Sequence, residues 1–126
     1  MAAATGHSRK VGRLKKRSEF LAVAAASNRR CAMPGLVLQA RPAQGEAEPA
    51  VRIGYTATKK IGNAVARNRA RRRLKAAAHD VLYRGEGEPR PSELVLVARQ
   101  GTIDRPYGEL VSDLKTALKR LEVLES

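Results

Sequence analysis

Residues 59–75 read KKIGNAVARNRARRRLK and contain eight Lys or Arg residues with no Asp or Glu. A helical pattern runs through and beyond this stretch, because apolar residues recur at the spacing of one helix face, at Ala70, Leu74, Ala77, Ala78 and Val81. Asn63 precedes the pattern and can accept a backbone N–H as the N-cap. The stretch therefore predicts an ordered helix that packs on a core by one face and carries basic residues elsewhere.

The charge of this helix predicts a polyanionic partner. Ordinary solvated helices mix acidic and basic residues, so that opposite charges pair four residues apart. Here Arg67, Arg71 and Lys75 line one edge of the apolar face, and further arginines continue around the helix. Phosphate groups relieve the repulsion among guanidinium groups and match their two-pronged geometry. A solvated helix face or a localisation tag is the alternative, but the pattern favours nucleic-acid binding.

Composition limits the other possibilities. The 126 residues suit one small domain, and the net charge of +13 is concentrated in residues 1–75. The single Cys31 provides neither a disulfide framework nor a thiolate metal cluster, and no apolar run approaches the ~18 residues of a membrane span. His7 and His79 lack partners at metal-ligand spacing. We therefore expect no catalytic or metal-binding residue and a cytoplasmic location, although acid-free residues 1–18 weakly resemble an organellar transit peptide.

Apolar runs separated by Gly and Pro divide the chain into helices and strands. We expect a first helix at 18–26, strands at 36–40, 51–57 and 94–98, and a last helix that begins near 104–106. Residues 42–49 contain two Pro, one Gly and two Glu, and predict a hairpin loop between the first two strands. Packing the helices on one side of a mixed sheet is the economical arrangement, and a right-handed crossover is the default.

Three segments of the chain resemble a known family, the protein component of bacterial ribonuclease P. The longest is RIGYTATKKIGNAVARNRARRRLKAAA at Arg52–Ala78, and it is supported by RLKKRSEFLAV at Arg13–Val23 and ELVLVAR at Glu93–Arg99. Together the matches span most of the chain, from about Arg13 to Leu121, with fitting spacing between them. Ribonuclease P is the ribonucleoprotein that removes the 5′ leader from precursor tRNA.

The resemblance implies a fold and a domain layout. It implies a two-layer α–β sandwich of the α+β class, with the element order αβββαβα, a mixed four-stranded sheet and a left-handed βαβ crossover around the basic helix. We expect residues 1–12 to form a flexible leader, residues 13–124 to form a single RNA-binding domain, and residues 125–126 to end the chain.

The resemblance also implies an activity in which the protein is not the catalyst. The chain would be a subunit of a tRNA 5′-processing endoribonuclease, a hydrolase whose chemistry is carried by the catalytic RNA subunit and the Mg²⁺ ions that this RNA chiefly binds. The expected partners are that RNA and precursor tRNA, with no membrane and no obligate protein partner.

Site residues follow from the positions that match the family motifs. The residues expected to bind the RNA subunit are Lys59, Lys60, Asn63, Arg67, Asn68, Arg69, Arg71, Arg72 and Arg73. Those expected to bind the leader, in a cleft between the first helix and the sheet, are Phe20, Lys16, Arg17, Arg52 and Arg99. Stacking of a base on Phe20 would be tolerant of sequence, but a purely core-packing role for this aromatic is an equal alternative.

The chain departs from the family pattern where leader contact is expected. Ala24 stands where many relatives have a second aromatic residue, and Gly35 and Leu38 stand near positions that are often aromatic. Leader binding would then depend more on phosphate charge and more steeply on salt. The alternatives are a small basic ribosomal or general RNA-binding protein and, less in keeping with a helix covered in Arg, a DNA-binding domain.

Overall fold

A five-stranded sheet forms the centre of the computed structural model, which describes residues 11–26, 29–45, 49–85 and 88–125. The strands are β1 (Val11–Arg13), β2 (Arg30–Met33), β3 (Leu36–Pro42), β4 (Val51–Thr56) and β5 (Ser92–Ala98). The helices are α2 (Arg17–Ala25), α3 (Ala64–Ala78), α4 (Gln100–Asp104) and α5 (Tyr107–Arg120), with a 3₁₀ turn η1 (Lys59–Ile61) and a π-helical turn η2 (His79–Tyr83). The strand order is β1-β4-β5-β3-β2.

Strand β5 occupies the middle of the sheet, parallel to β4 and antiparallel to β3. The prediction of a hairpin around residues 42–49 is therefore wrong, because β5 separates the two strands that were expected to pair. The reason lies in burial: six of the seven residues of β5 are buried, so this strand is stabilised by neighbours on both edges and cover on both faces.

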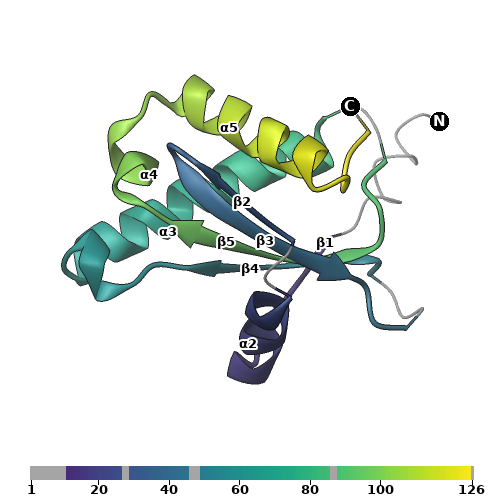
Figure 1. The fold of residues 1–126 in the computed structure, drawn as a ribbon. Coiled ribbons are helices and arrows are strands. Elements are labelled where there is room, and N and C mark those ends of the chain that lie inside the picture. The colour runs from purple at the N-terminus through teal and green to yellow at the C-terminus, as the bar shows by residue number, and fades with distance from the viewer. Residues whose placement is uncertain (1–10, 27–28, 46–48, 86–87, 126) are drawn as a thin grey trace.

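The main core lies between the sheet and helices α3 and α5, which cover the same face (Figure 1). The predicted apolar stripe of α3 is confirmed, since all five of its residues are at most 3% exposed. Alternate residues of the strands meet it, because successive strand side chains point to opposite faces. The sheet and α5 contribute Leu36, Leu38, Leu94, Leu96, Leu110, Leu114 and Leu118.

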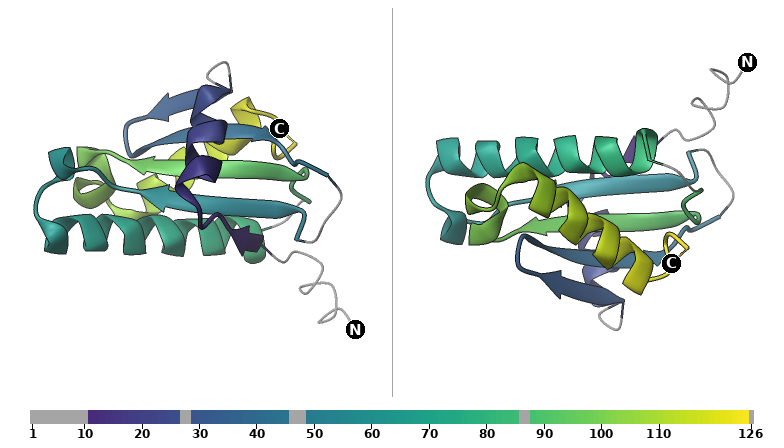
Figure 2. Two further views of the ribbon diagram at one scale, coloured as in Figure 1. Left: turned by 90° about the horizontal axis from the view of Figure 1, so that it is seen from below. Right: turned by 90° about the horizontal axis from the view of Figure 1, so that it is seen from above.

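Helix α2 lies on the opposite face of the sheet from α3 and α5 (Figures 1 and 2). Val23 of α2 packs there with Leu14 and Val95, while Phe20 and Val97 are partly buried against them. The expectation of helices on one side of the sheet thus holds for α3 and α5 only. Both faces of β5 are apolar, so the second face also requires cover.

The connection from β4 through α3 to β5 is left-handed (Figure 2). The resemblance implied this hand, whereas the general rule for parallel strands favours the opposite one. Helix α3 runs antiparallel to both strands and returns the chain to the edge where β5 begins (Figure 2). The crossover thereby places the basic helix beside β4, where its exposed side borders the edge of the sheet.

Strand β1 is one strand more than expected and pairs in parallel with the first half of β4. Its residues Val11 and Gly12 were assigned to the flexible leader, and this boundary is corrected; residues 1–10 lie outside the described part of the chain. Three residues are too few to show strand periodicity. The pairing also leaves β4 without an edge partner from Gly54 onward within the described sheet.

Candidate RNA interface

The basic helix α3 begins at the predicted cap. Asn63 Oδ1 accepts a hydrogen bond from the backbone N–H of Ala66 at 2.9 Å, as expected from the sequence. Gly62 before it has a φ of 139°, which strongly favours glycine. Arg67 Nη1 donates to the Gly62 carbonyl oxygen at 2.9 Å. These bonds fix the residue at which the helix begins, and so determine which of the following side chains face away from the sheet.

The outer side of α3 carries the exposed members of the predicted RNA-binding set. Arg69 and Arg72 are exposed, and so are Lys59 and Lys60 in η1. Arg71 Nη1 donates to Asn68 Oδ1 at 2.9 Å, so that Asn68 orients this guanidinium group without neutralising it. The arrangement presents cationic donors to solvent on a rigid element, and phosphate oxygens are the groups that satisfy such donors best.

Arg73 differs from the other arginines of the helix. Its Nε donates to the carbonyl oxygen of Thr102 at 2.7 Å, and its Nη2 donates to that of Arg105. Both acceptors belong to the segment around α4. Arg73 therefore fastens α3 to its neighbour, and two of its donors are already used.

A groove lies between α2 and the sheet, and we call it the α2 groove. Its volume is about 470 Å³, and it is lined by Lys15, Arg17, Phe20, Leu21, Ala24, Gln39, Tyr55, Thr56, Val95 and Val97. Phe20 lies directly over Gly54, because a Cβ added at that glycine would be 2.4 Å from the ring. The ring is thus packed on the backbone and still borders the groove, which combines both roles considered for it.

A second hollow, the bridging hollow, joins this groove to α3. It measures about 490 Å³ and is lined by Arg13, Leu14, Lys15, Phe20, Ile53, Gly54, Tyr55, Arg71 and Lys75. Lys75 Nζ lies 5.9 Å from the centroid of the Tyr55 ring, within cation–π range. Burial raises the pKa of Tyr55 to about 12, so its hydroxyl stays protonated at neutral pH. The basic helix and the groove therefore form one continuous surface.

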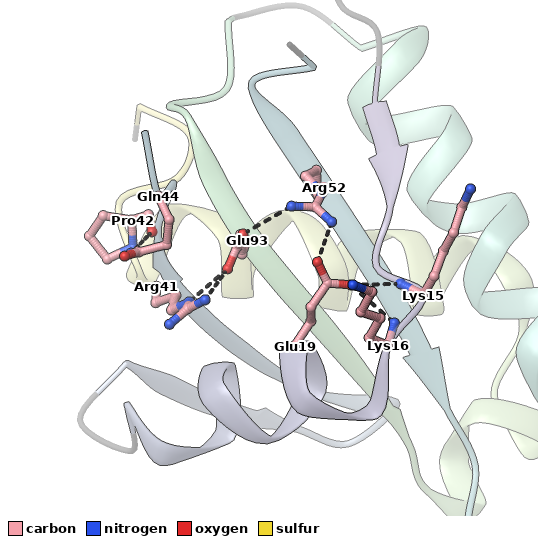
Figure 3. Close-up of polar contacts among 8 residues, drawn as sticks. All are labelled: Lys15, Lys16, Glu19, Arg41, Pro42, Gln44, Arg52 and Glu93. Carbon is pink, nitrogen blue, oxygen red and sulfur yellow. Dashed lines mark hydrogen bonds and ion pairs between the residues drawn. The ribbon is translucent and has the colours of Figure 1, made fainter. Parts of the chain in front are cut away.

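Arg52 does not line either hollow, because two carboxylates hold it (Figure 3). Its Nη2 contacts Glu19 Oε2, and its Nη1 lies 3.4 Å from Glu93 Oε2. Glu93 is buried and also binds Arg41 Nη2 at 2.6 Å. Glu19, Arg52, Glu93 and Arg41 thus form a row of alternating charges on the face of the sheet that α2 covers. The charge of Arg52 is therefore balanced by acids within the protein.

Glu19 also fixes the first turn of α2. Its Oε1 accepts hydrogen bonds from the backbone N–H groups of Lys15 and Lys16, each at 3.0 Å (Figure 3). These bonds, with Arg52, lower the pKa of Glu19 from 4.5 to about 2. The folded state therefore favours the ionised carboxylate. The contribution of this carboxylate to the stability of the fold is complete above pH 4.5 and is lost as the pH falls toward 2.

We accordingly expect Glu19→Gln to lower the free energy of unfolding at pH 6, where the carboxylate of the wild type is ionised. The difference between the two proteins should shrink between about pH 4.5 and pH 2, since the wild-type group becomes protonated there. Urea denaturation followed by circular dichroism at several pH values measures it. A difference that stays constant over this range would show that Glu19 acts through shape alone.

The remaining predicted leader residues divide between the groove and other places. Arg17 and Phe20 line the groove, whereas Lys16 is exposed without lining either hollow. Arg99 Nη1 donates to the Met33 carbonyl oxygen at 2.9 Å, at the turn between β2 and β3. Arg17 and Phe20 are thus brought together in the groove, and Lys16, Arg52 and Arg99 are not.

Sequence reasoning missed several residues that line the two hollows. Arg13, Lys15, Tyr55 and Lys75 border them and were not assigned to a site. The basic run at 13–17 contained a signal, but the pattern could not tell which of its side chains would face the sheet. Tyr55 provides a second aromatic ring that lines the same two hollows as Phe20.

The other two positions discussed for missing aromatics lie away from the groove. Leu38 is fully buried in the main core under α5 and α3. The Gly35 N–H donates to the buried carboxylate of Asp113 at 3.0 Å. Neither Gly35 nor Leu38 is among the residues that line the α2 groove.

Within the described ranges, no group of three or more His, Cys, Asp or Glu side chains is placed to hold a metal ion. No helix in the part of the chain that the structure describes is long and apolar enough to cross a bilayer. Cys31 is buried and forms no disulfide within the described residues.

The fold and this surface define an α+β protein that binds nucleic acid. The chain matches the family model Ribonuclease P over residues 9–122, and it therefore belongs to the ribonuclease P protein family. It is the protein subunit of the ribonucleoprotein that removes the 5′ leader of precursor tRNA, a tRNA-processing endonuclease, and its macromolecular partner is the RNA of ribonuclease P.

Individual relatives agree with the family model. The chain is 46% identical over 120 residues to the ribonuclease P protein component of Paramagnetospirillum magneticum, covering 92% of this chain and 86% of the relative. It is 49% identical over 111 residues to that of Gluconacetobacter diazotrophicus, covering 88% and 91%. The structure of the Staphylococcus aureus RNase P protein superposes with a TM-score of 0.70 at 23% identity, covering 92% of this chain and 100% of that one.

Proposed function

We propose that the exposed face of α3 docks the RNA subunit and that the α2 groove receives the single-stranded leader of precursor tRNA. The observation that supports this division is continuity: Arg71 and Lys75 of α3 border the same hollow as Phe20 and Lys15. One polyanion could thus be held on the helix while a second strand leaves it along the groove.

On the RNA-docking side, Arg69, Arg72, Lys59 and Lys60 are the principal contacts. Their side chains are exposed on ordered elements of the protein. Contacts with the phosphate groups of RNA require charge and geometry but no recognition of bases. Arg67, Asn68 and Arg71 form a second rank, because each takes part in a hydrogen bond that orients it. Asn63 caps the helix, and Arg73 holds it against α4.

On the leader side, Phe20, Arg17, Lys15 and Arg13 are the principal contacts. An aromatic ring beside cations suits a strand of variable sequence, since every base has a face that stacks and every nucleotide carries a phosphate. Arg52 acts instead through Glu19, which caps α2 and so positions the wall of the groove. Lys16 and Arg99 contribute long-range charge.

We propose further that the protein supplies no catalytic group and that the Mg²⁺ needed for hydrolysis is bound chiefly by the RNA. Residues 13–124 would act as one RNA-binding domain in the bacterial cytoplasm, with β1 as part of it. The protein would promote cleavage by holding the precursor in place on the RNA, because phosphate neutralisation and positioning both favour binding of the substrate.

Reconstitution tests this function directly. The purified chain is added to a bacterial ribonuclease P RNA at low Mg²⁺, and cleavage of a 5′-extended precursor tRNA is followed. Stimulated cleavage at the mature 5′ end that requires the RNA is the expected result. Binding to RNA without any stimulation would favour the general RNA-binding alternative.

Phe20→Ala tests the groove within that assay. Loss of a stacking face is expected to weaken binding of precursor tRNA by about 1 to 3 kcal/mol, while binding of mature tRNA changes little because it has no leader. Tyr107→Ala is a matched control, since Tyr107 is an aromatic residue that is 37% exposed on α5 and lines neither the α2 groove nor the bridging hollow. Equal losses for precursor and mature tRNA would assign Phe20 to packing on Gly54 alone.

A further inference from the structure

A third hollow, the Tyr83 hollow, lies where α3 passes into the π-helical turn η2. It has a volume of about 240 Å³ and is lined by Val11, Gly12, Arg13, Ile53, Tyr55, Lys75, Ala78, His79, Leu82 and Tyr83. Two aromatic rings and a patch of aliphatic side chains form its walls, and none of the lining residues is acidic. Ligand pockets are commonly lined in this way, by apolar and aromatic side chains with a few polar groups that orient the ligand.

The Tyr83 hollow continues the path of the other two. The α2 groove and the bridging hollow share Lys15, Phe20 and Tyr55. The bridging hollow and the Tyr83 hollow share Arg13, Ile53, Tyr55 and Lys75. No Asp or Glu is among the residues that line the three hollows, so a strand of nucleic acid along this path would lie against basic, aromatic and aliphatic side chains.

Tyr83 is held in place for contact with a ligand. Its hydroxyl donates to the Val11 carbonyl oxygen at 2.9 Å and accepts from the Val11 N–H at 3.1 Å. Its ring stacks on His79, with centroids 5.0 Å apart and planes at 29°. The residue nevertheless remains 38% exposed. A ring that is fixed in position and partly open to solvent loses little entropy when a base stacks on it.

We propose that the Tyr83 hollow is a subsite for one nucleobase of the single-stranded leader, at the far end of the path from the α2 groove. Tyr83 and Tyr55 provide the stacking faces, and Arg13 and Lys75 contact the flanking phosphates. The volume supports a single base, because pockets for larger ligands hold about 300 to 1,000 Å³. This inference rests on the proposed role of the α2 groove and extends it.

The test uses the reconstituted complex and precursor tRNAs whose unstructured leaders of one sequence are lengthened one nucleotide at a time. With the wild type, affinity should rise in two steps, the second when the leader reaches the Tyr83 hollow. Tyr83→Leu is expected to remove the second step, weakening long-leader precursors at least about five-fold and leaving short ones unchanged. Tyr83→Phe should keep it, because the ring remains while the hydrogen bonds to Val11 are lost.

Tyr107→Leu is the matched control, since Tyr107 is 37% exposed and its hydroxyl donates to Asp80; it should not alter the dependence on leader length. The proposal is overturned if Tyr83→Leu leaves long leaders unaffected, or if the Leu and Phe variants weaken all leaders alike. A loss of both steps in Phe20→Ala with no effect of Tyr83→Leu would retain the groove and reject the subsite. If neither Phe20→Ala nor Tyr83→Leu changes how affinity depends on leader length, the proposed function itself fails.

Photocrosslinking provides a second readout that needs no substitution at Tyr83. A 4-thiouridine is placed at each leader position in turn, and the crosslinked peptide is identified by mass spectrometry. A crosslink to residues 79–83 from one distal position is expected. Crosslinks confined to α2 at every position would contradict the subsite.

Discussion

The double substitution Arg69→Glu/Arg72→Glu is expected to weaken binding of the ribonuclease P RNA by at least about 100-fold, equivalent to ~3 kcal/mol. Both side chains are exposed on α3, and each can make a charge-assisted bond to phosphate of about 1.5 to 3 kcal/mol. Reversing the charge also replaces attraction by repulsion. Equilibrium binding to the RNA subunit, measured at several salt concentrations, provides the affinity and its salt dependence.

The salt dependence makes this test specific. Each phosphate contact that is lost should reduce the slope of log affinity against log salt by about one, so a reduction of about two is expected for the double variant. The fold should not change, because exposed substitutions usually alter stability by within ~0.5 kcal/mol. Thermal unfolding checks that expectation.

A control of equal charge is available on α5. Lys115→Glu/Lys119→Glu reverses the same number of charges at exposed positions outside the proposed interface. It should weaken binding only through the change in net charge, and far less than the α3 variant. Equal effects of the two pairs would mean that the RNA responds to overall charge, and that α3 is not the docking surface.

The basic helix could be predicted from the sequence because its signals are local. The apolar stripe from Ala70 to Val81 repeats over several turns, and the Asn63 cap stands immediately before it. The unusual absence of acids is likewise visible within one segment. These signals do not depend on the rest of the fold. They therefore predicted both the helix and a polyanion as the partner of its exposed side.

The path of the leader could not be predicted, because it is assembled from segments that are distant in sequence. Arg13, Phe20, Tyr55 and Lys75 border one hollow only because β4 follows the short strand β1 in the sheet and is unpaired on that side from Gly54 onward. The hairpin expected between the strands at 36–40 and 51–57 would have placed β4 elsewhere. Nothing local in the sequence indicates that the later strand β5 inserts between them.

The ion pairs of Arg52 could not be predicted from the sequence either. Glu19 lies 33 residues before it and Glu93 lies 41 residues after it, so their pairing depends entirely on the fold. A basic residue in a matching motif was therefore assigned to the leader, although its charge is balanced within the protein. The number of basic residues in a segment therefore predicts an anionic partner only where the fold places no Asp or Glu beside those residues.

Asp113→Ala is expected to lower the free energy of unfolding by about 3 kcal/mol or more. The carboxylate is 6% exposed and accepts the Gly35 N–H at 3.0 Å, while its Oδ2 also lies 2.8 Å from Arg105 Nε. Removing it leaves a buried N–H without an acceptor and a guanidinium group without this partner. Breaking a buried ion pair costs about 3 to 5 kcal/mol, and the partial exposure of Arg105 places the effect toward the lower value.

The loss should extend toward α3, because the same cluster supports the segment that Arg73 holds. Thr102 Oγ1 donates to the Gly35 carbonyl oxygen, and Arg73 donates to the carbonyl oxygens of Thr102 and Arg105. Hydrogen exchange should therefore quicken in α4 and at the β2–β3 turn, together with a lower denaturation midpoint. RNA affinity of the remaining folded protein should change little, since the exposed side of α3 is untouched.

Asp104→Ala provides the comparison, because this carboxylate is exposed and accepts only from Gln100 Nε2 at 3.2 Å among the contacts in the described residues. It should cost within ~0.5 kcal/mol. Asp113→Asn keeps an acceptor for Gly35 and removes the charge, so it should lose less than Asp113→Ala if the orphaned N–H contributes to the cost. Equal stabilities for the Asp104 and Asp113 alanine variants would mean that water or a shift of Arg105 replaces the carboxylate, and that the bonds from Arg73 to the α4 segment do not depend on it.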